Sequence, residues 1–179
     1  MTEPFLGAPS APPEAAGTTV SLFSAALVAN ARSARRAADG TDALAADAWG
    51  HGVAWVTGVL EARGLSADRI AELSGVDLYG LPGSEDARPV MRLSGRVLST
   101  KDLRAGEGVS YGYTFTAEHD TRVALVTGGY AQGVVRSLGN RAVVLIDGTR
   151  CPIIGRVAMD VSVVDIRDLP VERGAVAVH

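Results

Sequence analysis

The residues that decide the fold open with Val109-Ser110-Tyr111-Gly112 and close with Gly155-Arg156-Val157-Ala158-Met159-Asp160. Between these ends lies the apolar run Ala142-Val143-Val144-Leu145-Ile146, which is followed by Asp147-Gly148. Apolar and β-branched runs that are bounded by glycine and aspartate predict strands joined by tight turns. We therefore expect this stretch to form antiparallel strands, with a hairpin around Asp147-Gly148.

Outward from this stretch, the strand signal continues in both directions as far as Met91 and the C-terminal end. Thr121–Thr127 and Val161–Ile166 are β-branched runs, and Gly174–His179 has the same character. Short strands at regular spacing are typical of a Greek-key sheet or a small barrel. The predicted fold class is α+β: a short helical N-terminal stub followed by a mainly-β Greek-key or small-barrel domain.

The N-terminal part has a different pattern. Ser24 is a candidate N-cap for a helix over Ala25–Ala38. Ala43–Gly52 predicts a strand that leads through a turn into a helix over Val53–Arg63, and Gly75–Gly80 predicts another strand.

Three domains follow from these patterns. Residues 1–17 are rich in Pro, Ala and Gly, so we expect a disordered leader there. Pro82, Gly83 and Pro89 indicate a linker. The predicted boundaries are 1–17 for the leader, 18–87 for the helical part and 88–179 for the β domain.

Composition excludes several classes of partner. The net charge is −3 and the chain has no basic run, which argues against nucleic-acid binding. No signal peptide and no apolar stretch of about 20 residues is evident, so we expect no membrane partner. The single cysteine, Cys151, excludes an internal disulfide and fits a reducing cytoplasm. His51 and His119 lack ligand partners at useful spacing, so no metal site is expected.

Three segments resemble, in order and spacing, the C-terminal β domain of the pyridoxal-phosphate-dependent alanine racemases. They are Arg88–Leu93, Ala105–Phe115 and Arg150–Asp160. The resemblance implies an isomerase lineage that interconverts L-alanine and D-alanine in D-alanine biosynthesis. It also implies pyridoxal phosphate as cofactor and an active site shared across a dimer.

The resemblance implies roles for residues of the β domain. Tyr111 matches the catalytic tyrosine that reaches across the dimer to abstract the substrate's α-proton. A phenol has a reference pKa of about 10, so this role needs a nearby positive charge or hydrogen bond. Met159 matches the residue whose backbone amide contacts the substrate carboxylate. The alternatives are an ordinary packed tyrosine for Tyr111 and a core filler for Met159.

Further positions match supporting roles. Tyr130 and Arg156 match residues near the route by which substrate reaches the site, and Asp160 follows Met159 in the same segment; Asp160 could equally cap a turn. Gly75 and Val76 match positions whose backbone amides meet the cofactor phosphate.

The N-terminal part resembles the same family with decisive departures. Ala45–Gly52 resembles the motif Lys-Ala-Asp-Ala-Tyr-Gly-His-Gly, whose lysine forms the Schiff base with the cofactor. Ala45 stands in the place of that lysine, and a methyl group cannot form an imine. Trp49 replaces the phosphate-contacting tyrosine, and Leu73 replaces an arginine that faces the pyridine nitrogen. Only about 20 residues separate Gly52 from Gly75, where the family has most of a barrel of roughly 250 residues.

Four hypotheses remain open. The first is an alanine racemase-related protein that is not catalytic alone, because losing one member of a cooperating catalytic set forfeits most of the rate. The second is a β-domain partner or regulator, in a homodimer or in a heterodimer with an intact racemase, that donates Tyr111 across the interface. The third is a divergent pyridoxal-phosphate-dependent racemase of a small amino acid. It would need Lys101, the only lysine, which we expect in a turn region. The fourth is an internal deletion or a gene fragment.

Overall fold

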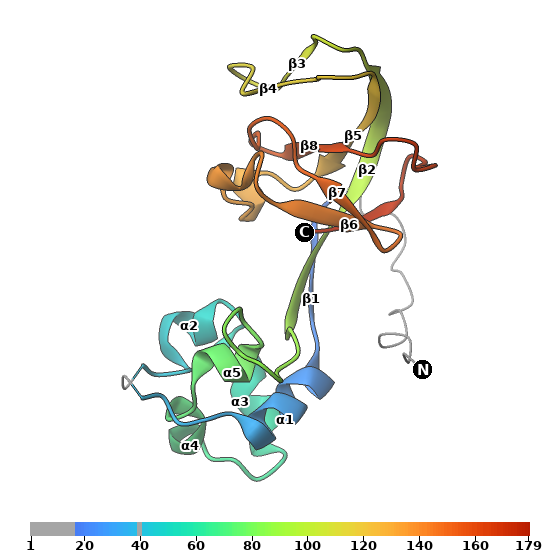
Figure 1. Ribbon diagram of the computed structural model, residues 1–179. Coiled ribbons are helices and arrows are strands. Elements are labelled where there is room, and N and C mark those ends of the chain that lie inside the picture. Colours follow the sequence, from blue (N-terminus) through green and yellow to red (C-terminus); the bar gives the residue numbers. More distant parts are fainter. Residues whose placement is uncertain (1–16, 39–40) are drawn as a thin grey trace. The chain divides into compact units, whose positions relative to one another are not determined.

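The computed structural model describes residues 17–38 and 41–179, and it divides into two compact units (Figure 1). The helical unit is Val20–Leu93, and the β unit is Ser94–His179 together with residues 17–19. All of the predicted leader except Gly17 lies outside the described residues. Each unit is described by itself.

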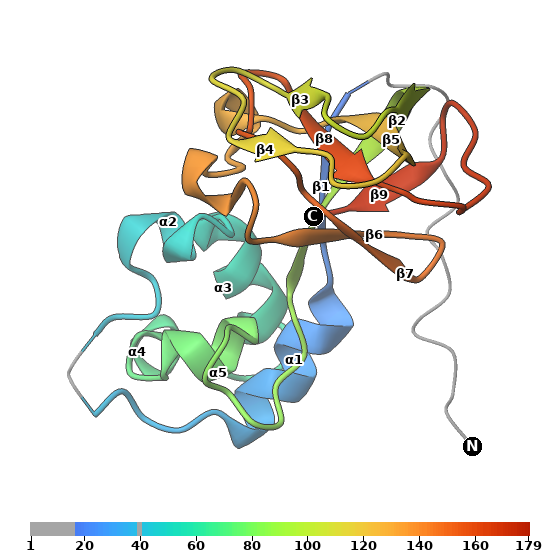
Figure 2. The same ribbon diagram turned by 45° about the horizontal axis from the view of Figure 1, so that its top comes forward.

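The β unit is built from antiparallel strands in the order β7-β6-β9-β2-β5-β8 (Figure 2). Strand β2, which begins in the helical unit, also pairs with β1 (Thr19–Leu22). Strand β2 pairs with β9 through Ser94–Arg96 and with β5 through Val97–Leu103, and its register to β5 shifts between Val97 and Ser99. The strands are β2 (Met91–Leu103), β5 (Thr121–Thr127), β6 (Val143–Ile146), β7 (Thr149–Pro152), β8 (Val161–Asp165) and β9 (Val176–Val178).

The two ends of this strand order meet. Ile153, just after β7, forms a bridge with Val164 of β8, and the Ile154 amide donates to the Val163 carbonyl at 2.9 Å. The sheet therefore curls into a half-barrel, which confirms the predicted fold class. Apolar side chains that are at most 2% exposed fill it: Val97, Ala124, Val126, Val144, Ile146, Cys151, Ile153, Val164 and Ala177.

The predicted hairpin is also confirmed. Strands β6 and β7 pair around Asp147 and Gly148, whose φ values are 48° and 75°. Both central residues thus have the positive φ that matches the right-handed twist of a two-residue hairpin. A second, short pair, β3 (Gly108–Val109) and β4 (Phe115–Thr116), covers a small apolar cluster. That cluster consists of Leu103, Val109, Ala117, Val123 and Ile154.

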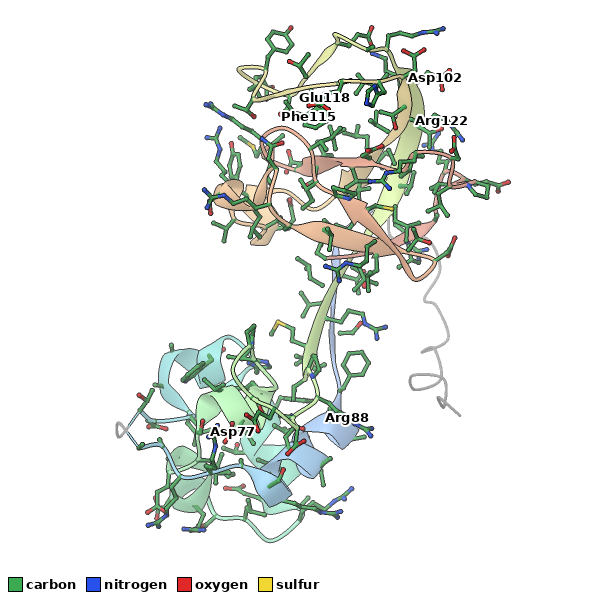
Figure 3. All side chains as sticks on the ribbon, viewed as in Figure 1. Asp77, Arg88, Asp102, Phe115, Glu118 and Arg122 are labelled. Atoms are coloured by element: carbon green, nitrogen blue, oxygen red, sulfur yellow. The ribbon has the colours of Figure 1, made fainter. Side chains whose placement is uncertain are left out.

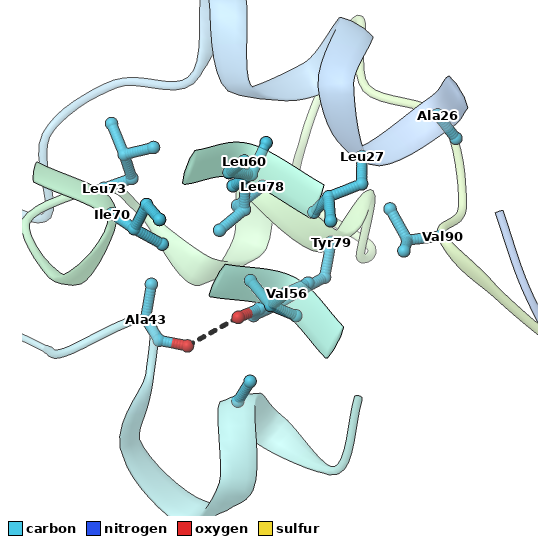
Figure 4. Close-up of a cluster of buried hydrophobic side chains, with 11 residues drawn as sticks. Ala26, Leu27, Ala43, Val56, Leu60, Ile70, Leu73, Leu78, Tyr79 and Val90 are labelled. Atoms are coloured by element: carbon cyan, nitrogen blue, oxygen red, sulfur yellow. Dashed lines mark hydrogen bonds between the residues drawn. The ribbon is translucent and has the colours of Figure 1, made fainter. Parts of the chain in front are cut away.

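The helical unit packs its helices around one apolar cluster (Figure 4). Tyr79 is 1% exposed, and its hydroxyl donates to the Ala43 carbonyl at 2.6 Å, so its polar end is satisfied inside the core. The helices are α1 (Ser24–Ser33), α2 (Ala45–Trp49), α3 (Val53–Glu61), α4 (Ala67–Ala71) and α5 (Gly75–Tyr79). The fully buried side chains include Leu27, Val56, Leu60, Ile70, Leu78, Tyr79 and Val90.

The predicted first helix is wrong at both ends. Phe23 occupies the N-cap position of α1, and no side chain caps the helix there. Ser24 is therefore its first residue and not its cap. The helix ends at Ser33 because Ala34 has φ −58° and ψ 129°, outside the helical region, while its amide still donates to the Asn30 carbonyl.

The strands that the sequence predicts within Ala43–Gly52 and Gly75–Gly80 are wrong. Gly75–Gly80 contains helix α5, because the Ser74 hydroxyl caps it by accepting from the Asp77 amide and Gly80, with φ 65°, ends it. Residues 46–49 of α2 form a left-handed turn with φ between 49° and 56°. The amides of Ala48 and Gly50 bond within this turn, to the carbonyls of Leu44 and Ala46, instead of to a neighbouring strand.

Candidate functional site

The Tyr111 loop, residues 110–114, is anchored by the Ser110 side chain while its tyrosine stays in solvent. Ser110 has φ 63°, and its hydroxyl donates to the Arg156 carbonyl at 2.7 Å. The Tyr111 side chain is 73% exposed. The alternative of a packed tyrosine is therefore wrong in this unit, and the ring is available to another molecule.

Arg156 lies against the same loop. The guanidinium carbon is 3.6 Å from the position that a Cβ on Gly112 would occupy, and Gly112 itself has φ 74°. Gly155 has φ 71°, and a Cβ there would lie 2.8 Å from the Val109 carbonyl oxygen. Both positions favour glycine, because their φ values are positive and a side chain at residue 155 would meet the Val109 carbonyl. These two glycines allow the Arg156 guanidinium to lie beside Gly112, the residue that follows Tyr111.

The Met159 loop, residues 156–160, packs against the short helix η1 (Tyr130–Gln132). The amides of Tyr130 and Ala131 donate to the carbonyls of Ala158 and Met159 at 3.0 and 2.9 Å. Met159 is 54% exposed, so a core role for it is wrong. Tyr130 is 40% exposed. The two loops thus present Tyr111, Tyr130 and Met159 on the surface of the β unit.

Asp160 takes part in a side-chain network. Its carboxylate accepts from the Gln132 amide nitrogen at 3.1 Å, and Gln132 Oε1 accepts from the Gly129 amide at 3.0 Å. Asp160 therefore helps to hold η1 against the Met159 loop. The guanidinium of Arg136 lies over the Tyr130 ring, 5.3 Å from its centroid. Sequence reasoning did not predict Arg136, because nothing in its local pattern signals a ring 6 residues away in the chain.

Asn140 joins the two loops and was also missed. Its Oδ1 accepts from the Gly155 amide at 2.6 Å, and its Nδ2 donates to the Thr114 carbonyl at 3.2 Å. Its φ of 59° lies in the left-handed region, which asparagine tolerates better than most residues. The Gly139-Asn140 pair signals such a turn, but it does not show what the side chain bonds.

Replacing Asn140 with glycine should lower the β unit's free energy of unfolding by about 2 kcal/mol and loosen the Tyr111 loop. Glycine keeps the positive φ at no cost but removes the bonds to Gly155 and Thr114, each worth about 1 kcal/mol. Urea unfolding followed by circular dichroism gives the first effect, and ¹⁵N relaxation of residues 110–114 gives the second. Asn140→Ala should cost about 1 kcal/mol more, because alanine is strained at that φ. Unchanged relaxation in Asn140→Gly would contradict this account.

The cofactor-side residues lie in the helical unit. Gly75 is the first residue of α5 and is buried, and Val76 follows it. The Trp49 indole covers Gly75: a Cβ there would lie 2.6 Å from the ring carbon Cζ2. Ala45, at the start of α2, is exposed and carries no amine.

The residues present do not fit pyridoxal phosphate. An imine needs a lysine, and Ala45 stands where the family resemblance places one. Lys101 lies in strand β2 of the β unit, not in the predicted turn region, and its ammonium is 4.0 Å from the Glu107 carboxylate. Gly75, which matches a phosphate-contacting position, is covered by the Trp49 indole.

His51 makes the helical unit sensitive to pH. Its ring is 6% exposed and stacks on Tyr79 with centroids 4.1 Å apart; its Nδ1 lies 3.0 Å from the Ala48 carbonyl oxygen, and Nε2 has no partner. Burial lowers the pKa of His51 below its usual 6.5. The unfolded state therefore binds the proton more readily than the folded state, and stability falls as the pH drops below about 6.5.

We expect the urea midpoint of the helical unit to fall between pH 7 and pH 5. Trp49 and Trp55, the only tryptophans, both lie in this unit, so tryptophan fluorescence reports its unfolding. His51→Gln should remove most of this slope, since glutamine does not titrate. A slope that persists in His51→Gln would show that another group is responsible.

A cavity lies elsewhere in the β unit. It measures about 1030 Å³, and its lining contains none of the predicted site residues. Figure 3 labels four of the residues around it, Asp102, Phe115, Glu118 and Arg122. The described residues contain no group of three or more side chains suited to a metal ion. No helix in the described ranges is long and apolar enough to cross a membrane.

The fold and the loops define the β unit as an antiparallel half-barrel domain that presents an anchored tyrosine and methionine to solvent. Residues 90–178 match the family model "Alanine racemase, C-terminal domain". This half of the chain therefore belongs to the family of alanine racemase C-terminal domains.

Individual relatives agree with this assignment. Alanine racemase from Cereibacter sphaeroides (strain ATCC 17029) is 45% identical over 96 residues, which is 54% of this chain and 28% of the relative. Among solved structures, alanine racemase from Streptomyces coelicolor A3(2) is 33% identical, with a TM-score of 0.54, over 70% of this chain and 39% of that one.

A more distant structure shares the fold alone. It is alanine racemase from Bartonella henselae with covalently bound pyridoxal phosphate, which is 23% identical with a TM-score of 0.56, over 80% of this chain and 45% of that one. The chain spans less than a third of the length of the curated relatives it matches.

Proposed function

We propose that this chain is an alanine racemase-related protein that is not catalytic alone and that acts as the β-domain partner of an intact racemase. The observation that carries this proposal is the Tyr111 loop: the Ser110 hydroxyl anchors it to the Arg156 carbonyl, and Tyr111 is 73% exposed. The β unit thus keeps the residue that resembles the family's second base, while the helical unit has no lysine to serve as the first.

The exposed apolar side chains support docking on another protein. Large apolar groups that gather on one surface favour an interface. The contacts already described link the Tyr111 loop, η1 and the Met159 loop through Gly112, Arg156 and Asn140. Of the exposed large apolar side chains, six belong to these loops or lie close to them in the chain: Tyr111, Tyr113, Tyr130, Val135, Leu138 and Met159.

In this proposal the chain contributes one half of a shared site. The Tyr111 hydroxyl moves a proton at the α-carbon of a small amino acid, and Arg156 supplies positive charge beside the loop. The Met159 loop contacts the substrate carboxylate through backbone. The partner's barrel brings the lysine and pyridoxal phosphate, which this chain does not fit.

The absence of activity in the isolated chain is tested by α-proton exchange of L-alanine in deuterated water with added pyridoxal phosphate, followed by NMR. Wild type and Tyr111→Phe should both match the background of free cofactor. Exchange in wild type that Tyr111→Phe abolishes would instead support the divergent racemase, and Lys101→Ala would then show whether the only lysine forms the imine.

The partner role is tested by co-purification with an intact racemase at micromolar concentrations. We expect a complex whose formation depends on the exposed apolar face. Leu138→Glu, a surface change within that face, should weaken it, whereas Val20→Glu, at an exposed position of the helical unit, should not. Failure of the wild-type chain to bind at these concentrations would contradict the partner role.

A further inference from the structure

The phosphate-contacting position that the family resemblance places in the helical unit is covered by the chain itself. A Cβ on Gly75 would lie 2.6, 2.7 and 3.0 Å from the ring atoms Cζ2, Cε2 and Cη2 of Trp49. Ring atoms this near leave no room for a group on that side of Gly75. The five-residue helix α5 therefore begins under an indole ring.

The indole is held in this position from several sides. Its Nε1 donates to the Asp42 carbonyl at 3.2 Å, so the only polar group of the indole is hydrogen-bonded to backbone. Its ring also lies 6.1 Å from the Tyr79 ring, centroid to centroid, at 48°. Because the donor is used and the ring is packed, Trp49 offers nothing to an anion.

The cationic groups near Gly75 are paired with carboxylates. A cavity of about 340 Å³ is bordered by Trp49, Gly75, Arg35 and Arg36. Arg35 forms two bonds to the Asp77 carboxylate, at 2.7 and 2.8 Å, and these hold the pKa of Asp77 at about 2. Arg36 pairs with Glu72. An anion in this cavity would have to compete with the carboxylates of Asp77 and Glu72 for these guanidinium groups.

We infer that Trp49 is an internal plug over Gly75, so that the helical unit holds neither the phosphate of pyridoxal phosphate nor a free phosphate at Gly75 and Val76. This inference goes beyond the missing lysine, which concerns the imine and not the phosphate. The plug and the missing lysine are tested separately. Phosphate binding at Gly75 and Val76 would overturn the plug, but residue 45 would still be an alanine that cannot form a Schiff base.

The test uses NMR of the full chain with two probes, inorganic phosphate and pyridoxine 5′-phosphate. Pyridoxine 5′-phosphate carries the ring and phosphate but no aldehyde, so it cannot react with Lys101. We expect nuclear Overhauser contacts from the Trp49 Hζ2 and Hη2 protons to the Gly75 Hα protons in wild type. The amides of Gly75 and Val76 should not shift with either probe beyond a sodium chloride control of equal ionic strength.

Two tryptophan variants test whether the Trp49 ring, and not another part of the helical unit, covers Gly75. Trp49→Ala should remove the ring-current shift of the Gly75 resonances, whereas Trp55→Ala, the other tryptophan of the same unit, should retain it. If Trp49→Ala does not fold, the wild-type contacts alone decide the ring's position. Absence of those contacts, or a saturable shift of both amides with either probe in wild type, would overturn the inference.

Discussion

Replacing Asn30 with alanine should lower the helical unit's free energy of unfolding by about 3–5 kcal/mol, because it leaves several buried backbone groups without partners. Asn30 is 3% exposed. Its Nδ2 donates to the carbonyls of Leu78 and Arg88 at 3.1 and 2.7 Å, and its Oδ1 accepts from the Arg88 amide at 2.9 Å. One side chain thus ties α1 to the end of α5 and to the segment that leads into β2.

Urea unfolding followed by tryptophan fluorescence measures this effect, since both tryptophans lie in the helical unit. Ser33→Ala is the matched control on the same helix, because the Ser33 hydroxyl makes only one long bond, 3.4 Å, to the Asn30 carbonyl. It should change stability by less than about 0.5 kcal/mol. An Asn30→Ala midpoint equal to that of wild type would show that these bonds do not hold the unit together.

Replacing Gly129 with alanine should lower the β unit's free energy of unfolding by about 3 kcal/mol, because the new methyl group meets backbone that cannot give way cheaply. Its Cβ would lie 2.3 Å from the Met159 carbonyl oxygen and 2.4 Å from that of Ala158. Those two oxygens accept from the amides of Ala131 and Tyr130, so moving them breaks the contact between η1 and the Met159 loop.

Urea unfolding followed by circular dichroism measures the loss of stability, and the ¹³C-methyl resonance of Met159 reports the movement of its loop. The control is Gly58→Ala in α3, where a Cβ meets nothing within 4 Å. Alanine is the better helix former by up to about 1 kcal/mol, so this variant should be stabilised. A Gly129→Ala protein with an unshifted Met159 methyl would contradict the predicted displacement.

The β unit was predictable from sequence because its signals are local. Asp147-Gly148 has the residue types that a two-residue hairpin requires, and the runs around it alternate with the period of a strand. The helical unit was predictable in part: the helix predicted over Val53–Arg63 is α3, but the apolar residues of Gly75–Gly80 suit a strand or a short helix equally. The Ser74 cap and the absence of a pairing strand at this segment select the helix.

The candidate site was predictable in part. Resemblance indicated Tyr111, Met159, Tyr130, Arg156 and Asp160, and the structure brings their loops together in the β unit. No local pattern predicted the hydrogen bonds that hold these loops in place. The Asn140 side chain bonds residues 26 and 15 positions away in the chain, and such partners depend on the finished fold.

The covering of Gly75 by Trp49 could not be predicted for the same reason. The sequence shows only that a tryptophan stands where the family motif has tyrosine. Trp49 lies in the left-handed turn of residues 46–49, which four non-glycine residues adopt at a cost of roughly 1–2 kcal/mol each. Tertiary contacts must offset that cost, and they are not visible in a local pattern.

We expect Tyr111 to serve a site whose remaining groups come from another subunit. The most direct measurement is α-proton exchange of L-alanine in deuterated water by an intact racemase whose own second-base tyrosine is replaced by phenylalanine, with this chain added in excess. A positioned general base contributes roughly 10²–10⁴-fold. We expect wild-type chain to restore exchange by about this order, and Tyr111→Phe chain to restore none. Equal exchange with both chains, or none with either, would contradict the claim.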